Sequence, residues 1–311
     1  MKVRIGIGAV PLAGGPGPGA ELPALVDALE AREIDSLWLA DSASTGLIDP
    51  LVGMAFALSR TTRLKVGTGV LVLPGRNPAS VAAALASLAA LAPRRVLPVF
   101  GVRPARQQER TLFPVPDGAR PAVFEEAVTV VRRLLTEPSV SHHGRFFDLD
   151  DASVAPLPAR PLDIWLAGRA PVGLERAGRL GDGWLGSFVT PDEAAVARAT
   201  IAQAAAAAGR TIEPDHYGTN IAVVAPGTSP ADVARALGTT ARRRPDIDPA
   251  RLVADGWAAA REQIRQFVAA GLTKFVVRPA APVTSWTEFL DAYVDELAWL
   301  EDELSTAEAA A

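Results

Sequence analysis

Short runs of valine, isoleucine and leucine alternate along this chain with longer segments in which apolar residues recur every three or four positions. This alternation predicts parallel strands joined by helices. The expected strands are Val3–Gly8, Ser36–Ala40, Leu64–Val72, Val96–Phe100, Asp163–Ala167, Gly183–Gly186, His216–Val224 and Lys274–Val277. The expected helices are Ala20–Arg32, Asn77–Leu91, Val123–Leu135, Pro191–Ala208 and Trp257–Ala270.

Eight parallel strands with intervening helices predict an α/β fold, a (β/α)8 TIM barrel. The 311 residues are 49% hydrophobic and 21% charged, which suits one large barrel domain over residues 1–311. Two segments fall outside the strand and helix pattern. Pro11–Gly19, rich in proline and glycine, is either a lid over the site or a slack connector, and Ser139–Asp150 predicts a small hairpin before the fifth strand.

Composition removes several kinds of chemistry. The chain has no cysteine, which excludes disulfides, iron–sulfur clusters and thiolate zinc sites. The histidines are His142 and His143 in the insert and His216 at a strand start, so no metal site is predicted. Lys65 and Lys274 also begin strands, the wrong end for a Schiff base in a barrel. Redox chemistry would therefore need a bound cofactor.

Charge and hydropathy limit the partners. The net charge of -4 gives no general attraction for nucleic acid or an anionic membrane. The first residues lack the apolar stretch of a signal peptide, and no apolar run reaches membrane-spanning length. We therefore expect a cytoplasmic protein that acts on a small molecule.

The strand ends offer glycines and small hydroxyls. Gly67-Thr-Gly69 is a weak signal, and Pro74 stands where a nucleotide-binding helix would have to open. Gly168 and Arg169 follow a strand and precede a helix, which predicts a phosphate cradle at a positive helix end; an ordinary turn without a ligand is the alternative. Ser187 ends the next strand beside this cradle.

Three further residues near these strand ends have open roles. Asp41, at the end of the second strand, either orients a substrate or cofactor ring or caps a loop. Asp182 and Trp184 lie in the Gly181–Ser187 segment and are either part of the site or purely structural.

Taken together, five segments resemble the luciferase-like monooxygenase superfamily, and within it the actinobacterial oxidoreductases that use the deazaflavin coenzyme F420. The resemblance spans nearly the whole chain. Its carriers are Ser36-Leu-Trp-Leu-Ala-Asp41, Val66-Gly-Thr-Gly-Val-Leu-Val72 with Arg76-Asn77-Pro78, Trp165-Leu-Ala-Gly168, Ala177-Gly-Arg-Leu-Gly-Asp-Gly-Trp184 and Gly271-Leu-Thr-Lys-Phe-Val-Val-Arg-Pro279.

The resemblance implies a set of cofactor-binding residues. It places a non-prolyl cis peptide at Gly69-Val70, under the cofactor ring. It assigns the cofactor phosphate to the backbone after strand five and a hydroxyl after strand six. The implied set is Asp41, Ser42, Gly69, Val70, Gly101, Gly168, Arg169, Ala170 and Ser187.

The chain also departs from the family. Ser42 stands where many deazaflavin relatives have a histidine, and Phe100-Gly-Val-Arg103-Pro104 replaces their Gly-x-Gly. No catalytic acid is therefore identified, and Asp41 is only a weak candidate. Arg103 and Arg278 are candidates for binding an anionic substrate group, with a loop salt bridge as the alternative for Arg278.

The preferred hypothesis is hydride transfer between reduced F420 and a small organic substrate. One alternative is a monooxygenase that uses flavin mononucleotide (FMN) supplied by a separate reductase. Another is a non-catalytic barrel that binds a flavin-like ligand or none. The family resemblance also implies a homodimer, and the alanine-rich Ala199–Ala208 segment is either interfacial or exposed.

Overall fold

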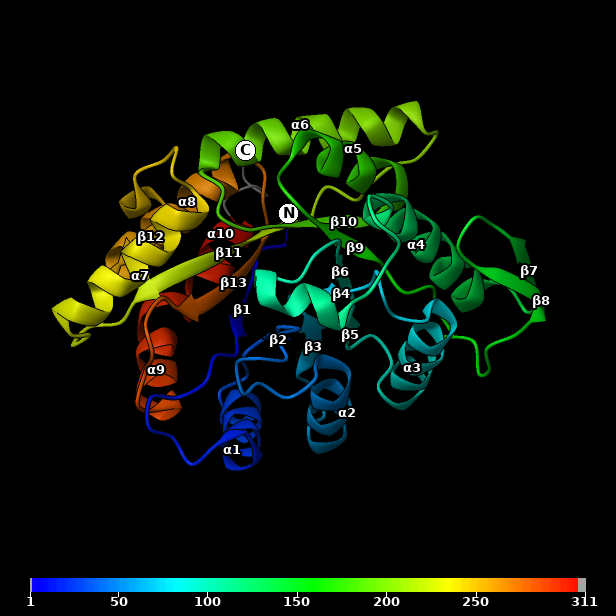
Figure 1. The fold of residues 1–311 in the computed structure, drawn as a ribbon. Helices are drawn as coiled ribbons and strands as arrows, with labels where there is room; N and C mark the ends of the chain where they lie inside the picture. Colours follow the sequence, from blue (N-terminus) through cyan, green and yellow to red (C-terminus); the bar gives the residue numbers. More distant parts are fainter. Residues whose placement is uncertain (1, 307–311) are drawn as a thin grey trace.

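In the computed structural model, which describes residues 2–306, the parallel strands form a closed ring (Figure 1). The first strand, β1 (Arg4–Gly8), pairs with both the second and the last, so that the sheet closes on itself. The remaining pairs continue the ring in chain order. Its other strands are β2 (Ser36–Leu39), β3 (Lys65–Thr68), β4 (Leu71–Val72), β5 (Val96–Leu97), β6 (Val99–Gly101), β9 (Trp165–Ala167), β10 (Gly183–Gly186), β11 (Tyr217–Val224) and β13 (Lys274–Pro279).

Two of the eight positions in the ring are broken strands. β3 and β4 are the halves of the predicted strand Leu64–Val72, separated at Gly69 and Val70. β5 and β6 are separated at Pro98, which has no amide hydrogen to give to the sheet. The first halves, β3 and β5, pair with each other, and so do the second halves, β4 and β6. The barrel therefore stays closed. The barrel prediction is confirmed, and the prediction of unbroken strands is wrong at these two places.

Helices cover the outside of the ring (Figure 1). Most begin with proline in the first turn, where the missing amide hydrogen costs nothing, and Asp49, Asn77, Thr190, Ser229 and Ser285 cap five of them. The helices are α1 (Pro18–Ala31), α2 (Pro50–Arg60), α3 (Pro78–Leu91), α4 (Arg120–Thr136), α5 (Pro171–Leu180), α6 (Pro191–Ala207), α7 (Pro230–Arg243), α8 (Gly256–Ala269), α9 (Trp286–Tyr293) and α10 (Leu300–Thr306). No helix within residues 2–306 combines the length and apolar character needed to cross a bilayer.

Short elements complete the chain. The predicted hairpin before strand five is confirmed as β7 (Val140–His143) and β8 (Asp148–Ala152), an antiparallel pair that lies outside the barrel beside α4 (Figure 1). The sequence did not predict β12 (Val253–Asp255), which pairs with β11. The remaining turns are η1 (Gln107–Leu112), η2 (Pro249–Arg251) and η3 (Val294–Ala298).

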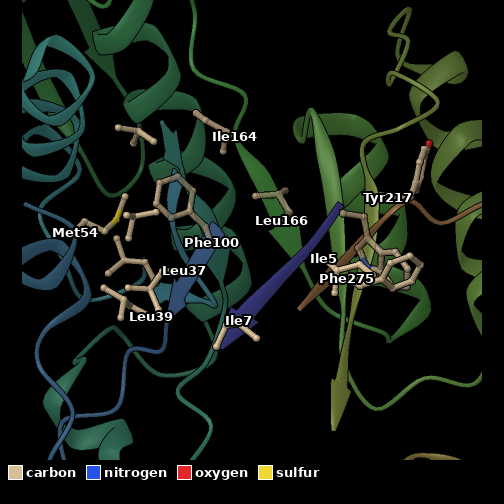
Figure 2. Close-up of a cluster of buried hydrophobic side chains, with 14 of the residues drawn as sticks. Ile5, Ile7, Leu37, Leu39, Met54, Phe100, Ile164, Leu166, Tyr217 and Phe275 are labelled. Atoms are coloured by element: carbon tan, nitrogen blue, oxygen red, sulfur yellow. The ribbon is translucent and has the colours of Figure 1, made fainter. Parts of the chain in front are cut away.

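The side chains of the ring form two cores, because neighbouring residues of a strand face opposite sides. The larger lies between the sheet and the helices, and Figure 2 shows part of it, with Leu37, Phe100 and Leu166 among the labelled side chains. The smaller lies inside the ring and consists of Trp38, Val99, Leu185 and Val276. We call these four residues the lumen layer, since they fill the middle of the barrel.

Residues of α9 and α10 near the C-terminus hydrogen-bond to β1 near the N-terminus. Ile5 of β1 donates its amide hydrogen to Glu301 Oε1 at 2.6 Å, and its carbonyl accepts from the Tyr293 hydroxyl at 2.8 Å. The Pro11–Gly19 segment is also held, because Glu21 of α1 accepts hydrogen bonds from the amides of Leu12 and Gly17.

Candidate functional site

The C-terminal end of the ring is lined by small residues. Residues two positions beyond the lumen layer face the same interior, and they include Ala40 after Trp38 and Ser187 after Leu185. A Cβ on Gly8 would lie 3.3 Å from the Cβ of Arg278, which places both at this end of the interior. The combination of small side chains and one guanidinium leaves room for a ligand above the lumen layer.

Asp41 supports the break in the third strand. Its amide hydrogen is donated to the Val70 carbonyl at 3.2 Å, and its carboxylate Oδ2 accepts from the Val72 amide at 3.0 Å and from Arg76 Nη2 at 2.9 Å. Only 4% of the Asp41 side chain is exposed. These contacts match the loop-anchoring alternative for Asp41. The Gly69-Val70 peptide is cis, as the family resemblance implied.

Val70 and Gly101 meet across neighbouring strands. A Cβ on Gly101 would come within 2.5 Å of the Val70 Cγ2, a distance that real Cβ atoms do not reach. Glycine at position 101 therefore lets Val70 turn into the ring. The structure thus brings together Asp41, Gly69, Val70 and Gly101, four of the residues predicted to hold the cofactor ring.

The predicted phosphate cradle lies on the other side of the ring, after β9. Gly168 has φ of 143°, a conformation that favours glycine, and its carbonyl accepts from Trp184 Nε1 at 2.7 Å. The amides of Arg169 and Ala170 donate no hydrogen bond to any other residue in the part of the chain that the structure describes. No side chain caps α5, which starts immediately afterwards.

Ser187 completes this cradle. β9 and β10 are neighbours with Ala167 opposite Leu185, so that Ser187 lies at the same end of the ring as Arg169. Free amides at the positive end of a helix, together with a hydroxyl, form an arrangement that binds phosphate. Trp184 is therefore structural, because it fixes the Gly168 carbonyl.

Asp182 is structural too, at the opposite end of the barrel. It precedes β10 and accepts hydrogen bonds from the Ile164 amide at 2.9 Å, Arg132 Nη2 at 2.7 Å and Arg210 Nη2 at 2.7 Å. This carboxylate joins the starts of two strands to two arginines.

The two arginines proposed for substrate binding lie in different surroundings. Arg278 faces the ring interior over Phe188, with Arg243 on the same aromatic ring. The buried Nε of Arg278 has no hydrogen-bond partner within residues 2–306. Burial lowers the pKa of Arg278, and the charge of Arg243 lowers it further. Arg103 is exposed near Arg120, and no contact joins it to Arg278.

Arg169 does not turn back toward its own cradle. Its Nη2 donates to the Arg243 carbonyl at 3.1 Å, at the end of α7. The amide of Arg169, rather than its guanidinium, is therefore the group available to a phosphate.

A buried carboxylate, Glu109 on η1, is the functional candidate that sequence reasoning missed. Its Oε1 accepts from Ser42 Oγ at 2.8 Å and from the Ser44 amide and hydroxyl at 2.9 and 2.6 Å, while its buried Oε2 has no partner in the described chain. Burial alone would raise the pKa of Glu109, but these hydrogen bonds and the charge of Arg106 outweigh it and lower the pKa. No periodicity or motif in the sequence marks this residue.

A cavity lies at each end of the barrel. One of about 470 Å³ lies at the C-terminal end, lined by Asp41, Ser42 and Arg76 among others. The larger, about 560 Å³, lies at the N-terminal end, where Lys65 and Lys274 begin their strands as predicted. No group of three or more His, Cys, Asp or Glu side chains within residues 2–306 is placed to hold a metal ion.

The histidines have other partners. His142 Nε2 lies 3.3 Å from Glu126 Oε1, and His143 Nδ1 lies 2.7 Å from Asp148 Oδ1. His216 Nδ1 lies 2.8 Å from the Asp182 carbonyl oxygen.

Comparison with known proteins confirms the fold and shows the family. The family model for luciferase-like monooxygenases matches residues 4–282, so the chain belongs to the luciferase-like monooxygenase family. Over 96% of the chain, the fold is that of a solved F420-dependent secondary alcohol dehydrogenase in complex with an F420-acetone adduct; the TM-score is 0.80 at 21% identity, and 98% of that protein is covered.

Several curated relatives carry the name F420-dependent glucose-6-phosphate dehydrogenase. The protein from Kineococcus radiotolerans is 32% identical over 50% of this chain and 49% of its own length. The protein from Nocardia farcinica is 29% identical over 80% of this chain and 82% of its own length. The chain spans about half the length of the first of these and of several other curated relatives that it matches.

Proposed function

We propose that this chain is an oxidoreductase that transfers a hydride between coenzyme F420 and a small organic molecule. Its family and the F420-dependent relatives support this proposal. The observation that carries it is the pair of free amides of Arg169 and Ala170, at the uncapped start of α5 and beside Ser187. No group within residues 2–306 occupies these donors, and amides at the start of a helix suit a phosphate group.

The residues present fit a phosphorylated planar cofactor. The Arg169 and Ala170 amides and the Ser187 hydroxyl would hold its phosphate, and Val70, turned inward against Gly101, would support its ring. When bound, F420 supplies or accepts the hydride. The protein contributes orientation and exclusion of water, which lower the barrier without further covalent chemistry.

Three side chains would act on the substrate side. Arg278 presents an unpaired Nε that can donate to a substrate oxygen. Ser42 donates its hydroxyl hydrogen to Glu109, which leaves the Ser42 oxygen as an acceptor for a substrate hydroxyl. Because the lowered pKa keeps Glu109 ionised, this carboxylate would hold the Ser42 hydroxyl in its orientation rather than exchange a proton with the substrate. Asp41 would act as a positioning residue through Val72 and Arg76.

Binding titrations test the cofactor. F420 and FMN would be titrated separately into the purified chain, with ligand fluorescence as the readout, and into Gly168→Asp and Gly209→Asp. Both glycines have positive φ, 143° and 68°, and a Cβ on either would meet no atom closer than 3.9 Å. Both substitutions strain the backbone, more so at position 168, and only that one places a carboxylate at the cradle, so the free energy of unfolding of each variant would be measured beside its affinity.

We expect wild type and Gly209→Asp to bind F420 alike, and Gly168→Asp to bind it at least about a hundredfold more weakly, since it places an anion against a phosphate. Preference for FMN would favour the monooxygenase with a separate reductase. Failure of both cofactors to bind would overturn the proposal and favour the non-catalytic barrel.

We further propose that the protein is cytoplasmic and a homodimer. Large apolar side chains are exposed on two helices that a second copy could cover. Val52 and Phe56, one helical turn apart on α2, are 62% and 36% exposed, and Val196 on α6 is 66% exposed. The α2 pair forms the more continuous stripe, so we propose it as the dimer contact.

A further inference from the structure

The hollow at the N-terminal end of the barrel is a second chamber, separate from the candidate cofactor site. Its volume is about 560 Å³, within the range of small-molecule sites. The lumen layer forms its roof, since Trp38 and Val99 line it and no residue of the phosphate cradle does. A molecule in this chamber would therefore not compete for space with a cofactor.

Two indoles lie flat on the walls of the chamber. A Cβ on Gly183 would come within 2.3 Å of the Trp165 ring, and a Cβ on Gly67 within 2.8 Å of the Trp38 ring. Glycine on the neighbouring strand thus lets each indole lie against the sheet instead of across the opening. Trp165 also lies beside His216, with ring centroids 5.5 Å apart. The result is an aromatic-walled space that the protein's own side chains leave open.

The inner charges of the chamber are already satisfied by the protein. Lys65 Nζ lies 2.6 Å from Asp35 Oδ1, and Lys274 Nζ lies 3.2 Å from Asp215 Oδ2. Arg4 Nη1 lies 3.0 Å from Glu301 Oε2. These cations therefore have little left to offer a ligand.

The rim of the chamber is different. Arg94 comes from the connection between α3 and β5, and Arg160 from the proline-rich connection before β9. Neither has a hydrogen bond or ion pair with any residue from 2 to 306. Five basic side chains and two carboxylates, Asp35 and Asp163, line the chamber in all, so its net charge is positive.

We propose that this chamber binds a small aromatic carboxylate of one or two rings. The ring system packs against Trp165 and beneath the buried Trp38, and the carboxylate faces the rim, where Arg94 and Arg160 neutralise it. Aromatic stacking and charge-assisted hydrogen bonds to arginine are the interactions that select such a molecule. The proposal is independent of the cofactor assignment, because the two spaces are separated.

Calorimetric titration with 2-naphthoate tests the chamber, with 2-naphthamide as the uncharged probe of the same shape. Each would be titrated into wild type and into two double variants, first alone and then with saturating F420. Arg94→Gln/Arg160→Gln removes the rim cations. Arg145→Gln/Arg242→Gln removes the same charge from exposed arginines elsewhere and serves as the matched control.

We expect one 2-naphthoate per chain, unaffected by F420, with affinity about tenfold lower in the rim variant and unchanged in the control. The amide should bind wild type and rim variant equally. Three results would overturn the proposal: no saturable 2-naphthoate binding, displacement of the naphthoate by F420, or equal weakening in both double variants. Failure of F420 to bind would overturn the cofactor proposal and leave this one standing.

Discussion

The two ends of the barrel use polar residues in opposite ways. At the N-terminal end, charges at the strand starts neutralise one another: Asp35 pairs with Lys65, Asp215 with Lys274, and Asp182 with two arginines. Such pairs join neighbouring strands to each other and to the helices. This end is therefore cross-linked by its charges.

At the C-terminal end, glycine and small side chains predominate and several donors are left unpaired. They include the amides of Arg169 and Ala170 and the Nε of Arg278. Unpaired donors cost stability, and a barrel tolerates them where a ligand will use them. The difference teaches that paired charges fasten the starts of the strands, whereas the ends of the strands keep donors free for a cofactor.

The largest expected loss of stability comes from removing the most connected carboxylate of the N-terminal end. Asp182→Ala leaves Arg132, Arg210 and the Ile164 amide without their shared acceptor. We expect the free energy of unfolding to fall by about 2 to 4 kcal/mol, measured by urea denaturation, with F420 affinity within about twofold. A loss below about 1 kcal/mol would contradict the division between the two ends.

A pH-dependent contribution is expected from Glu301, which holds β1. Burial, together with Asp35, raises the pKa of the Glu301 carboxyl from 4.5 to about 7, although the Ile5 amide and Arg4 oppose the shift. The folded state therefore binds a proton that the unfolded state releases between these pH values, and stability falls as pH rises through that window.

Comparing urea denaturation of wild type and Glu301→Gln at pH 4.5 and 7.5 checks this sign. The loss of stability on going to pH 7.5 should be about 1 to 2 kcal/mol smaller in the variant. Parallel pH profiles would show that Glu301 titrates at its ordinary value.

At the C-terminal end, a conservative change should affect binding more than stability. Asp41→Asn keeps the size of a side chain that supports Val72 and Arg76. We expect about 1 kcal/mol less stability and about tenfold weaker F420 binding, because the Gly69-Val70 segment is no longer held in place. Stability lost without a change in affinity would place Asp41 with the structural carboxylates.

The smallest effect on stability is expected on the outer surface. Phe56→Glu on α2 should change the free energy of unfolding by less than about 0.5 kcal/mol and convert a dimer to a monomer, as measured by light scattering on size-exclusion fractions. Val196→Glu on α6 is the matched control. A monomer produced by the α6 variant alone would move the interface to α6.

Local patterns were sufficient to predict most of the strands and the closed barrel. Short apolar runs between helical segments mark the buried strands of a barrel. Strands such as Ser36–Leu39 and Gly183–Gly186 were therefore predicted close to their observed bounds. The break at Pro98 was missed, because an apolar run continues on both sides of it, whereas the irregularity at Gly69-Val70 was expected only from the family resemblance. Helix α7 was missed because its face is largely exposed and charged.

The site residues divide in the same way. The glycines and Ser187 could be predicted because strand ends meet at one end of a barrel. Glu109 could not, because its burial depends on Ser42 and Ser44, more than 60 positions earlier in the chain. The N-terminal chamber could not be predicted either, since it depends on how Trp38 and Trp165 lie against glycines of neighbouring strands.

The bonds that fasten Ile5 have a consequence for how the protein is made. Of the described strands, β1 is synthesised first, yet one of its two neighbours is β13, and its Tyr293 partner lies 288 residues further on. Until the last strand emerges, β1 keeps an unpaired edge, the kind of surface that chaperones protect and that aggregates if left exposed. Closure of this ring therefore has to wait for β13, and it depends on contacts between residues far apart in the sequence, which form slowly.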